Sequence, residues 1–291
     1  MPSLNITIED TSPVISYSTG WRAGHSSGDQ SANRYSQSSF TVTNVQGATA
    51  SFSFNGTSVG IFGAKRGNHG AYQVKLDSTL YPPNSGKAND PGIFQTPLFS
   101  AAGLSQGFHT VTLTNQEGSF LDIDFITWET TVGTNSSGNF YVNTVQDTSP
   151  SFTYLPSETD WGVPSKNIGS FMGGSGHATT KSGASLTYSF DVGESVSLYG
   201  PVGPDGSLFA VHVDGSSASA YTTVQEFYTP QSLLYHASSL GPGSHNLTLI
   251  CQPINPQQTF AVDYAVVFTT AAPLATPNLG CVNQVVVFLP H

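Results

Sequence analysis

The sequence predicts an all-β protein made of two tandem, homologous jelly-roll β-sandwiches. Short runs that alternate, or that are rich in β-branched and aromatic residues, recur along the whole chain. Clusters of Gly, Asn, Ser and Pro separate these runs, and no segment keeps a helical apolar period over three turns. The third observation is an internal sequence repeat: residues 8–19 read IEDTSPVISYST, and residues 145–156 read VQDTSPSFTYLP.

The match between the two halves continues at a nearly constant offset. Residues 58–63 (SVGIFG) correspond to residues 195–200 (SVSLYG). Matched polar residues keep the same spacing to within a few positions, and these pairs are Asp10/Asp147, Asp77/Asp214, His109/His245 and Asp124/Asp263. A period near 140 residues is too long for a solenoid repeat, so each copy is a whole domain.

Strand-like runs in the first copy come in a regular order. They occupy residues 40–43, 50–54, 59–62, 72–76, 109–113 and 121–125. About seven or eight short strands per copy favour an antiparallel sandwich of the jelly-roll type.

The domain boundaries follow from composition and from the repeat. We expect a first jelly-roll domain over residues 1–132, a Gly/Ser/Asn-rich linker over 133–139 and a second jelly-roll domain over 140–270. Residues 271–291 form a C-terminal tail with three prolines and an apolar end that could add an edge strand.

Charge and composition exclude several classes of partner. Only 9% of the residues are charged, the net charge is −10, and eight residues are Lys or Arg. Nucleic-acid binding and a polybasic membrane anchor both need clustered cations, so we expect neither. No apolar run approaches the length of a transmembrane helix, and residues 1–3 lead directly into a strand, as in a processed mature form. These features indicate an extracellular or cell-surface protein.

Sequons and cysteines fit the same location. Four Asn-x-Ser/Thr sequons are candidate glycosylation sites, at Asn5, Asn55, Asn135 and Asn246. Cys251 and Cys281 are the two cysteines, and a disulfide between them would tie the tail to the second domain. The alternative is two unrelated thiols.

The closing hairpin of the first copy carries a resemblance to known folds. Residues 107–113 (GFHTVTL), followed by 121–126 (LDIDFI), resemble the last strands of galactose-binding-like jelly rolls, which include family 6 and family 35 carbohydrate-binding modules. Together with DTSPVISY and FGAKRGNHGAYQVKLD, these residues resemble the tandem ectodomain repeats of uncharacterised fungal surface proteins. The resemblance implies the fold and an extracellular location, and it says little about the ligand.

Four matched aspartates are candidate metal ligands. In the similar carbohydrate-binding modules, an acidic residue near the start and an Asp on the last strand help to hold a structural Ca²⁺. The resemblance assigns these roles to Asp10 with Asp124, and to Asp147 with Asp263. The alternative is that each Asp accepts backbone N–H groups in a turn. No other cofactor is expected.

A cationic loop in the first copy is the candidate ligand site. Its hydrogen-bond donors are Lys65, Arg66, Asn68 and His69, and the candidate stacking rings are Trp21, Tyr35 and Tyr72. Sugars pack their C–H faces on aromatic rings while polar donors fix their orientation. The same loop in the second copy, residues 201–206, has no cation. The alternative is a solvated hairpin in which Arg66 pairs with a carboxylate.

Glycan binding is the function that these features favour. One alternative is a glycoside hydrolase with two carboxylates in a cleft between the domains, and another is a non-catalytic accessory or scaffold subunit. The sequence contains no GxSxG elbow, HExxH motif or Gly-rich phosphate loop, so no catalytic residue is assigned.

Overall fold

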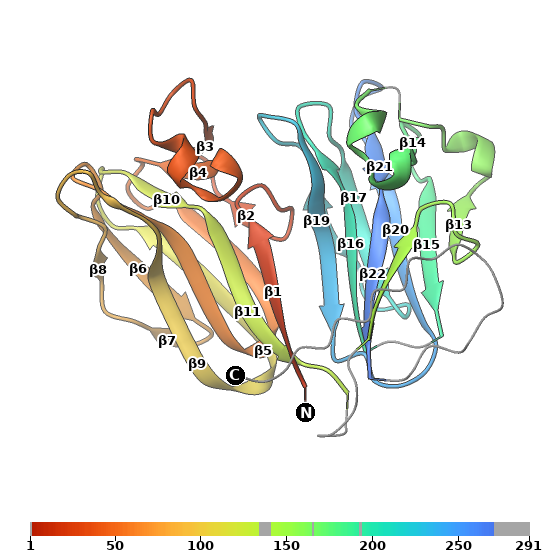
Figure 1. Cartoon of the computed structure of the whole chain (residues 1–291), viewed down its shortest axis with the longest axis horizontal. Coiled ribbons are helices and arrows are strands. Elements are labelled where there is room, and N and C mark those ends of the chain that lie inside the picture. Colours follow the sequence, from red (N-terminus) through yellow and green to blue (C-terminus); the bar gives the residue numbers. More distant parts are fainter. Residues whose placement is uncertain (1, 134–140, 165, 192–193, 271–291) are drawn as a thin grey trace. The chain divides into compact units, whose positions relative to one another are not determined.

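The chain folds almost entirely into antiparallel β-strands, which confirms the predicted fold class. The computed structural model describes residues 2–133, 141–164, 166–191 and 194–270. Within these ranges the helical elements are short 3₁₀ turns, and no helix is long and apolar enough to cross a membrane. Residue contacts divide the chain into two compact units (Figure 1). The N-terminal unit is Leu4–Thr130, and the C-terminal unit holds the remaining described residues.

The N-terminal unit contains one large and one small sheet. The large sheet follows the order β1-β11-β5-β9-β6-β7, with β2 on β5 and β8 on β6, and the small sheet follows β10-β4-β3. The strands are β1 (Ser3–Glu9), β2 (Ser16–Tyr17), β3 (Trp21–Gly24), β4 (Phe40–Thr43), β5 (Thr49–Lys65), β6 (Ala71–Leu76), β7 (Thr79–Leu80), β8 (Asn84–Ser85), β9 (Ile93–Asn115), β10 (Leu121–Ile123) and β11 (Phe125–Thr131). Two 3₁₀ turns, η1 (Ala32–Arg34) and η2 (Ser36–Ser38), lie in the segment that leads from β3 to β4.

Two strands of the N-terminal unit are longer than the sequence predicts. Runs 50–54 and 59–62, expected as separate strands, are both parts of β5, which pairs with β9 over nearly its whole length. Gly56 faces Gly107 in this pairing, and the register shifts directly afterwards. Two facing glycines and a bulge let a strand change direction without ending, so the chain stays continuous where a turn was expected.

The described part of the C-terminal unit also contains eleven strands, which form three sheets. Its sheets follow the orders β12-β22-β16-β19, β13-β15-β20-β17-β18 and β14-β21. The strands are β12 (Tyr141–Gln146), β13 (Phe152–Leu155), β14 (His177–Thr179), β15 (Ser185–Phe190), β16 (Ser195–Val202), β17 (Leu208–Val213), β18 (Ser219–Thr222), β19 (Thr229–Ser238), β20 (His245–Gln252), β21 (Phe260–Val262) and β22 (Tyr264–Thr269). The 3₁₀ turns are η3 (Glu158–Asp160), η4 (Ile168–Ser170) and η5 (Met172–Gly174).

Alternating burial along the strands builds the core. In β15 every second side chain is buried, and these residues pack into one apolar cluster with partners from β16, β17, β20 and β22. Trp161 is 4% exposed, and its ring meets Phe260 edge-on with centroids 6.3 Å apart. Burial on one face and polar residues on the other is the pattern of a sandwich whose interior is closed by two sheets.

Several of the predicted features lie wholly or partly outside the described residues. Cys281, Asn135, most of the predicted linker and the whole tail lie outside them. Cys251 is buried, with its Sγ 3.7 Å from Ser207 Oγ, and its pairing with Cys281 stays a prediction. The sequon residues Asn5 and Asn246 are exposed. Asn55 is half-buried, and its side-chain oxygen accepts a hydrogen bond from Gln106 Nε2 at 2.6 Å.

A matched glycine lets β5 and β16 lie close to the strand beside them. A Cβ atom at Gly63 would lie 2.6 Å from the carbonyl oxygen of Asp122 and 2.8 Å from Leu98 Cδ1. At Gly200 it would lie 2.5 Å from the carbonyl oxygen of Ala261 and 2.8 Å from Leu234 Cδ1. In both units, therefore, the backbone approaches a neighbouring strand and an apolar side chain too closely for any residue larger than glycine.

Replacing Gly63 with Ala tests this close approach. We expect Gly63→Ala to lower the free energy of unfolding by about 1–3 kcal/mol, because the new methyl group forces the backbone apart. Urea denaturation measures the change. Gly118→Ala is the control, since a Cβ atom there has no heavy atom within 4 Å. Equal midpoints for the two variants would contradict the packing argument.

Candidate functional site

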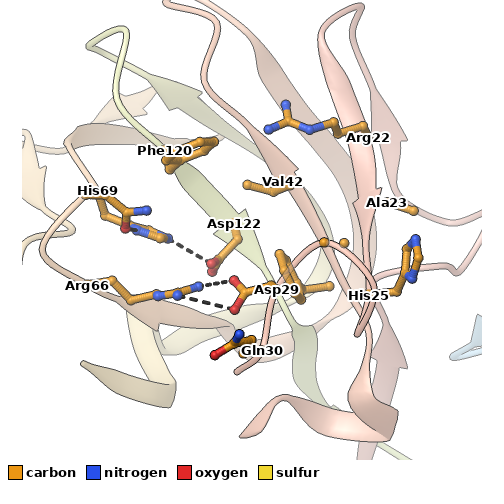
Figure 2. A pocket seen from close by; sticks show the side chains of 14 residues that line it. Arg22, Ala23, His25, Asp29, Gln30, Val42, Arg66, His69, Phe120 and Asp122 are labelled. Atoms are coloured by element: carbon orange, nitrogen blue, oxygen red, sulfur yellow. Dashed lines mark hydrogen bonds and ion pairs between the residues drawn. The ribbon is translucent and has the colours of Figure 1, made fainter. Parts of the chain in front are cut away.

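A cavity of about 370 Å³ opens in the N-terminal unit beside the loop that joins β5 to β6 (Figure 2). The β3–β4 hairpin, the segment that follows β3 and the residues that lead into β10 complete its wall. Polar and charged side chains from all of these segments point into it: Arg22, His25, Asp29, Gln30, Arg66, Asn68, His69 and Asp122. Phe40, Val42 and Phe120 supply its apolar surface.

An ion pair spans one side of the cavity. The Arg66 guanidinium binds the Asp29 carboxylate through two N–H groups, with the Nη2–Oδ1 contact at 3.3 Å. Asp29 Oδ1 also accepts the Ser31 backbone N–H at 2.8 Å. The Arg66 and Asp29 side chains are 22% and 20% exposed, so the pair keeps a face toward solvent. Although burial opposes it, hydrogen bonding to Arg66 helps to hold the Asp29 pKa below its usual value.

A buried carboxylate organises the wall behind this pair. Asp122 has no exposed surface, and its Oδ2 lies 2.8 Å from His69 Nε2 and 2.6 Å from the Tyr35 hydroxyl, which donates to it. Its Oδ1 accepts the Ala64 backbone N–H at 2.6 Å. The other ring nitrogen of His69 lies 2.9 Å from Asn68 Oδ1. Asp122 thus holds His69, Tyr35 and the end of β5 in fixed places.

Aromatic rings support the charged groups. Tyr35 stacks on Phe40 with centroids 4.1 Å apart, and its ring meets Phe94 edge-on at 5.0 Å. The Arg66 guanidinium carbon lies 5.4 Å from the centre of the Phe94 ring. On the opposite side, the Arg22 guanidinium carbon lies 5.7 Å from the centre of the half-exposed Phe120 ring. Phe120 therefore offers a partly open aromatic surface inside the cavity.

The structure brings together only part of the predicted ligand site. Arg66, Asn68 and His69 line the cavity, whereas Lys65 and Trp21 do not. His69 is 2% exposed and both of its ring nitrogens face protein oxygens, so its role as a donor to a sugar is not supported.

Two of the predicted stacking rings are corrected by burial. Tyr72 has no exposed surface, and its hydroxyl donates to the Leu98 carbonyl oxygen at 2.7 Å. Tyr35 is 3% exposed and lies in the wall behind the cavity. Neither ring can stack on a sugar, because core residues cover both. Trp21 is half-exposed on β3, where its ring packs against Tyr17 with centroids 5.1 Å apart.

Sequence reasoning missed the opposite wall. Arg22, His25, Asp29 and Gln30 lie in a segment with no strand-like alternation, and Phe120 lies beside a turn. One signal was available for Phe120: it directly precedes the run 121–125, which was expected to be the last strand of the hairpin. The pairing of Asp29 with Arg66 spans 37 residues, and no local pattern indicates it.

The aspartates predicted as metal ligands lie in buried hydrogen-bonded clusters. Asp10 Oδ1 accepts from Ser39 Oγ at 2.9 Å, and Asp10 Oδ2 accepts from Thr41 Oγ1 at 2.8 Å. Asp124 Oδ1 accepts the Ser36 backbone N–H at 2.9 Å. Burial raises the pKa of both Asp10 and Asp124 to about 7, with a further contribution from neighbouring Glu9. Asp124 thus accepts a backbone N–H group, as in the alternative, whereas Asp10 accepts from two hydroxyl groups.

The C-terminal unit repeats this arrangement with one change. Asp147 accepts from Ser175 Oγ at 2.6 Å, but its second oxygen faces His177 Nδ1, also at 2.6 Å. Asp263 accepts the Met172 backbone N–H at 2.9 Å, and burial raises its pKa to about 6. The carboxylates of Asp10 and Asp147 are both fully engaged with protein groups.

Metal binding has limited support from the described residues. They contain no group of three or more His, Cys, Asp or Glu side chains that could hold a metal ion. Two carboxylate oxygens of the N-terminal unit, Glu9 Oε2 and Asp124 Oδ2, are nevertheless buried without a hydrogen-bond partner. If a cation binds here, Glu9 and Asp124 are the residues whose oxygens are available to it.

Comparisons with known proteins point to carbohydrate-related relatives. No family model matches the chain. A curated protein from Flavonifractor plautii, named A type blood alpha-D-galactosamine galactosaminidase, is 24% identical over 244 residues, which is 84% of this chain and 21% of that protein. The chain thus spans about a fifth of that relative.

Similar solved structures include carbohydrate-active and carbohydrate-binding proteins. A Paenibacillus xanthan lyase matches with 15% identity and a TM-score of 0.35, over 88% of this chain and 25% of the lyase. The N-terminal CBM22-1-CBM22-2 tandem domain from Paenibacillus barcinonensis matches with 10% identity and a TM-score of 0.28, over 88% and 93% of the two chains. Because these TM-scores are low, the fold is defined by the strands of this chain and their pairing, and not by these similarities.

The buried carboxyls predict a stability that falls as the pH rises. The folded-state pKa values of Asp10 and Asp124 lie above the usual aspartate value of 3.8, so between about pH 4 and pH 7 the folded state holds more protons than the unfolded state. The free energy of unfolding should therefore decrease by about 2–4 kcal/mol across this window. Urea denaturation midpoints at pH 4.5, 6.0 and 7.5 measure the decrease.

A matched pair of variants isolates the buried group. Asp10→Asn removes one titrating carboxyl, so the fall in stability between pH 4.5 and pH 7.5 should be smaller than in the parent. Asp90→Asn makes the same charge change at an exposed aspartate and should keep the full fall. An identical pH dependence in all three proteins would exclude Asp10 as a source.

Proposed function

We propose that this chain is a glycan-binding protein whose N-terminal unit holds a sugar in the cavity beside Arg66. The observation that carries this proposal is the partly exposed Arg66–Asp29 pair inside an open cavity with a half-exposed Phe120. The name of the curated relative, a galactosaminidase, supports a carbohydrate-related function for this chain.

The cavity offers the chemistry that a sugar needs. A hydroxyl group can accept from a guanidinium N–H and donate to a carboxylate oxygen, and the Arg66–Asp29 pair presents both within one contact. Arg22 and Gln30 line the cavity with exposed polar side chains. The Phe120 ring can pack against the C–H face of a pyranose. A volume of about 370 Å³ lies within the usual range for small-ligand sites.

The state of the two cavity carboxylates favours binding over hydrolysis. A glycosidase needs one carboxylic acid that donates a proton and a second carboxylate that attacks or activates water. Asp122 is fully buried and accepts from three protein groups, and Asp29 is paired with Arg66 and with the Ser31 N–H. Neither carboxylate is therefore free to act as the proton donor or as the nucleophile or base. Hydrolysis remains the alternative, because the curated relative is named as an enzyme.

We further propose that the two units are copies of one domain and act outside the cell. The repeated sequence motifs support duplication. The hydrogen bonds within each unit support it too, because Asp10 and Asp147 each accept from a serine hydroxyl, and Asp124 and Asp263 each accept a backbone N–H group. The four sequons and the low charge density support an extracellular location. Because the chain matches one fifth of a longer enzyme, a role as an accessory binding module of a larger protein is compatible with this function.

Replacing Arg66 tests the binding site. An array that displays glycans ending in galactosamine, N-acetylgalactosamine or galactose first identifies the ligand, a choice guided by the name of the curated relative. Arg66→Ala should then weaken binding at least tenfold, since it removes the donor side of the pair, and should lower stability by about 1 kcal/mol or less. Titration calorimetry measures the affinity.

The control for this experiment is the neighbouring cation. Lys65 precedes Arg66 in the chain but does not line the cavity, so Lys65→Ala should bind the same glycan within about twofold of the parent. If Lys65→Ala and Arg66→Ala bind equally well, the cavity is not the glycan site. Release of sugar from the same glycans by the parent protein would favour the hydrolase instead.

We also propose that Glu9 and Asp124 take part in binding a structural Ca²⁺ in the N-terminal unit. At pH 7.5, CaCl₂ at a hundredfold excess over its Kd should stabilise the protein by about 2.7 kcal/mol, and EDTA should reverse the effect. Glu9→Gln should abolish the stabilisation, because it removes one of the two oxygens without a partner. A melting temperature that does not respond to Ca²⁺ would refute the proposal.

A further inference from the structure

The C-terminal unit has its own cavity, of about 450 Å³, built from different chemistry. It lies beside the loop that follows β16, residues 201–206, which matches the cationic loop of the N-terminal unit at the same offset as Gly63 and Gly200. Four prolines and two aromatic residues line it: Pro164, Pro201, Pro204, Pro256, Phe171 and Tyr228. Polar residues complete the lining: Lys166, Asn167, Thr180, Asp205, Gln257 and Thr259. This cavity therefore combines proline and aromatic rings with polar groups, whereas Arg66 and Asp29 form an ion pair in the first cavity.

A single position explains how space for Tyr228 arises. Gly203 stands at the offset of Arg66, and a Cβ atom there would lie 3.3 Å from Tyr228 Cα. Any larger residue at this position would place its Cβ atom in tight contact with Tyr228. The Tyr228 hydroxyl lies 3.0 Å from Ser170 Oγ, and the residue is 39% exposed. The ring is thus held at one end and open along part of its surface.

Backbone hydrogen bonds fix the loops that carry the apolar residues. Gly203 N–H donates to the Thr223 carbonyl oxygen at 2.9 Å, and Gln225 N–H donates to the Gly203 carbonyl oxygen at 3.0 Å. Thr259 N–H donates to the Asp205 carbonyl oxygen at 2.7 Å. Since proline rings also restrict the backbone, the cavity is formed before a ligand arrives.

Exposed apolar side chains gather on these same loops. Val163, Val224, Phe227 and Ile254 are 74%, 40%, 40% and 75% exposed. None of the four lines the cavity, but three of them lie within two residues of lining residues, Pro164, Tyr228 and Pro256. The rim carries one ion pair, Lys166 Nζ to Asp205 Oδ2 at 2.8 Å, with both side chains exposed.

We propose that this cavity binds an aromatic ring that carries a polar substituent, such as the phenyl group of an aryl glycoside. A flat apolar ring can pack on Tyr228 and on the proline rings, which offer no N–H donor to a buried hydroxyl. The polar substituent meets the rim, where Lys166, Asp205 and Gln257 provide donors and acceptors. This site is separate from the cavity beside Arg66, and it stands whether or not the N-terminal unit binds a glycan.

Three matched glucosides test the ligand class with the whole protein. Phenyl β-D-glucopyranoside should bind at least tenfold more tightly than methyl β-D-glucopyranoside, and more tightly than cyclohexyl β-D-glucopyranoside, as measured by titration calorimetry or ligand-observed NMR. Equal binding of the phenyl and methyl compounds would overturn the proposal. Equal binding of the phenyl and cyclohexyl compounds would overturn the aromatic assignment.

Variants test whether the phenyl group binds in the cavity. Tyr228→Ala should weaken binding of phenyl glucoside at least tenfold, whereas Tyr228→Phe keeps the ring and should bind within about threefold of the parent. Phe108→Ala is the control, because Phe108 is an exposed aromatic residue of the N-terminal unit that does not line the cavity. Undiminished binding by Tyr228→Ala would overturn the site.

Discussion

Buried carboxylates at the junction of the first and last strands hold the functional loops of both units. Asp10 and Asp124 together bind the segment between η1 and β4 through Ser36, Ser39 and Thr41. A buried carboxylate is costly unless donors satisfy its oxygens, and loop N–H and hydroxyl groups need acceptors because no helix or sheet provides them. The loop donors therefore satisfy the carboxylate oxygens, and the carboxylates provide the acceptors that the loop groups require. Without these contacts the loop that carries Tyr35 would lose its place beside Asp122.

The same anchors support two cavities with different chemistry. In the C-terminal unit, Asp263 holds Met172 and Asp147 holds Ser175, so η4 and η5 are fixed as η1 and η2 are in the N-terminal unit. The cavities beside these anchored segments are lined by different side chains. One presents an arginine–aspartate pair, and the other presents proline and tyrosine rings. Framework and ligand chemistry can change independently, since binding residues lie on loops that a rigid scaffold positions.

Residues that repeat between the halves were predictable from the sequence, and residues paired by tertiary contact were not. The matched pairs Asp10/Asp147 and Gly63/Gly200 take matching structural roles, because an internal repeat keeps what the fold requires. Tyr72 was misassigned although its strand contained the needed signal: it alternates with Val74 and Leu76, and all three are buried. The Arg66–Asp29 contact depends on a loop with no periodic pattern, so only the folded chain shows it.

One substitution changes how a buried carboxylate is balanced. Asp10 faces two hydroxyl groups, Ser39 and Thr41, which donate hydrogen bonds but carry no charge. In the C-terminal unit the second hydroxyl is replaced by His177, whose Nδ1 lies 2.6 Å from Asp147 Oδ2. Neutral donors leave the cost of the buried charge largely uncompensated at Asp10, so burial raises the pKa of Asp10 to about 7. The two units thus keep the same anchor with different partners: two hydroxyl groups face Asp10, whereas one hydroxyl group and an imidazole face Asp147.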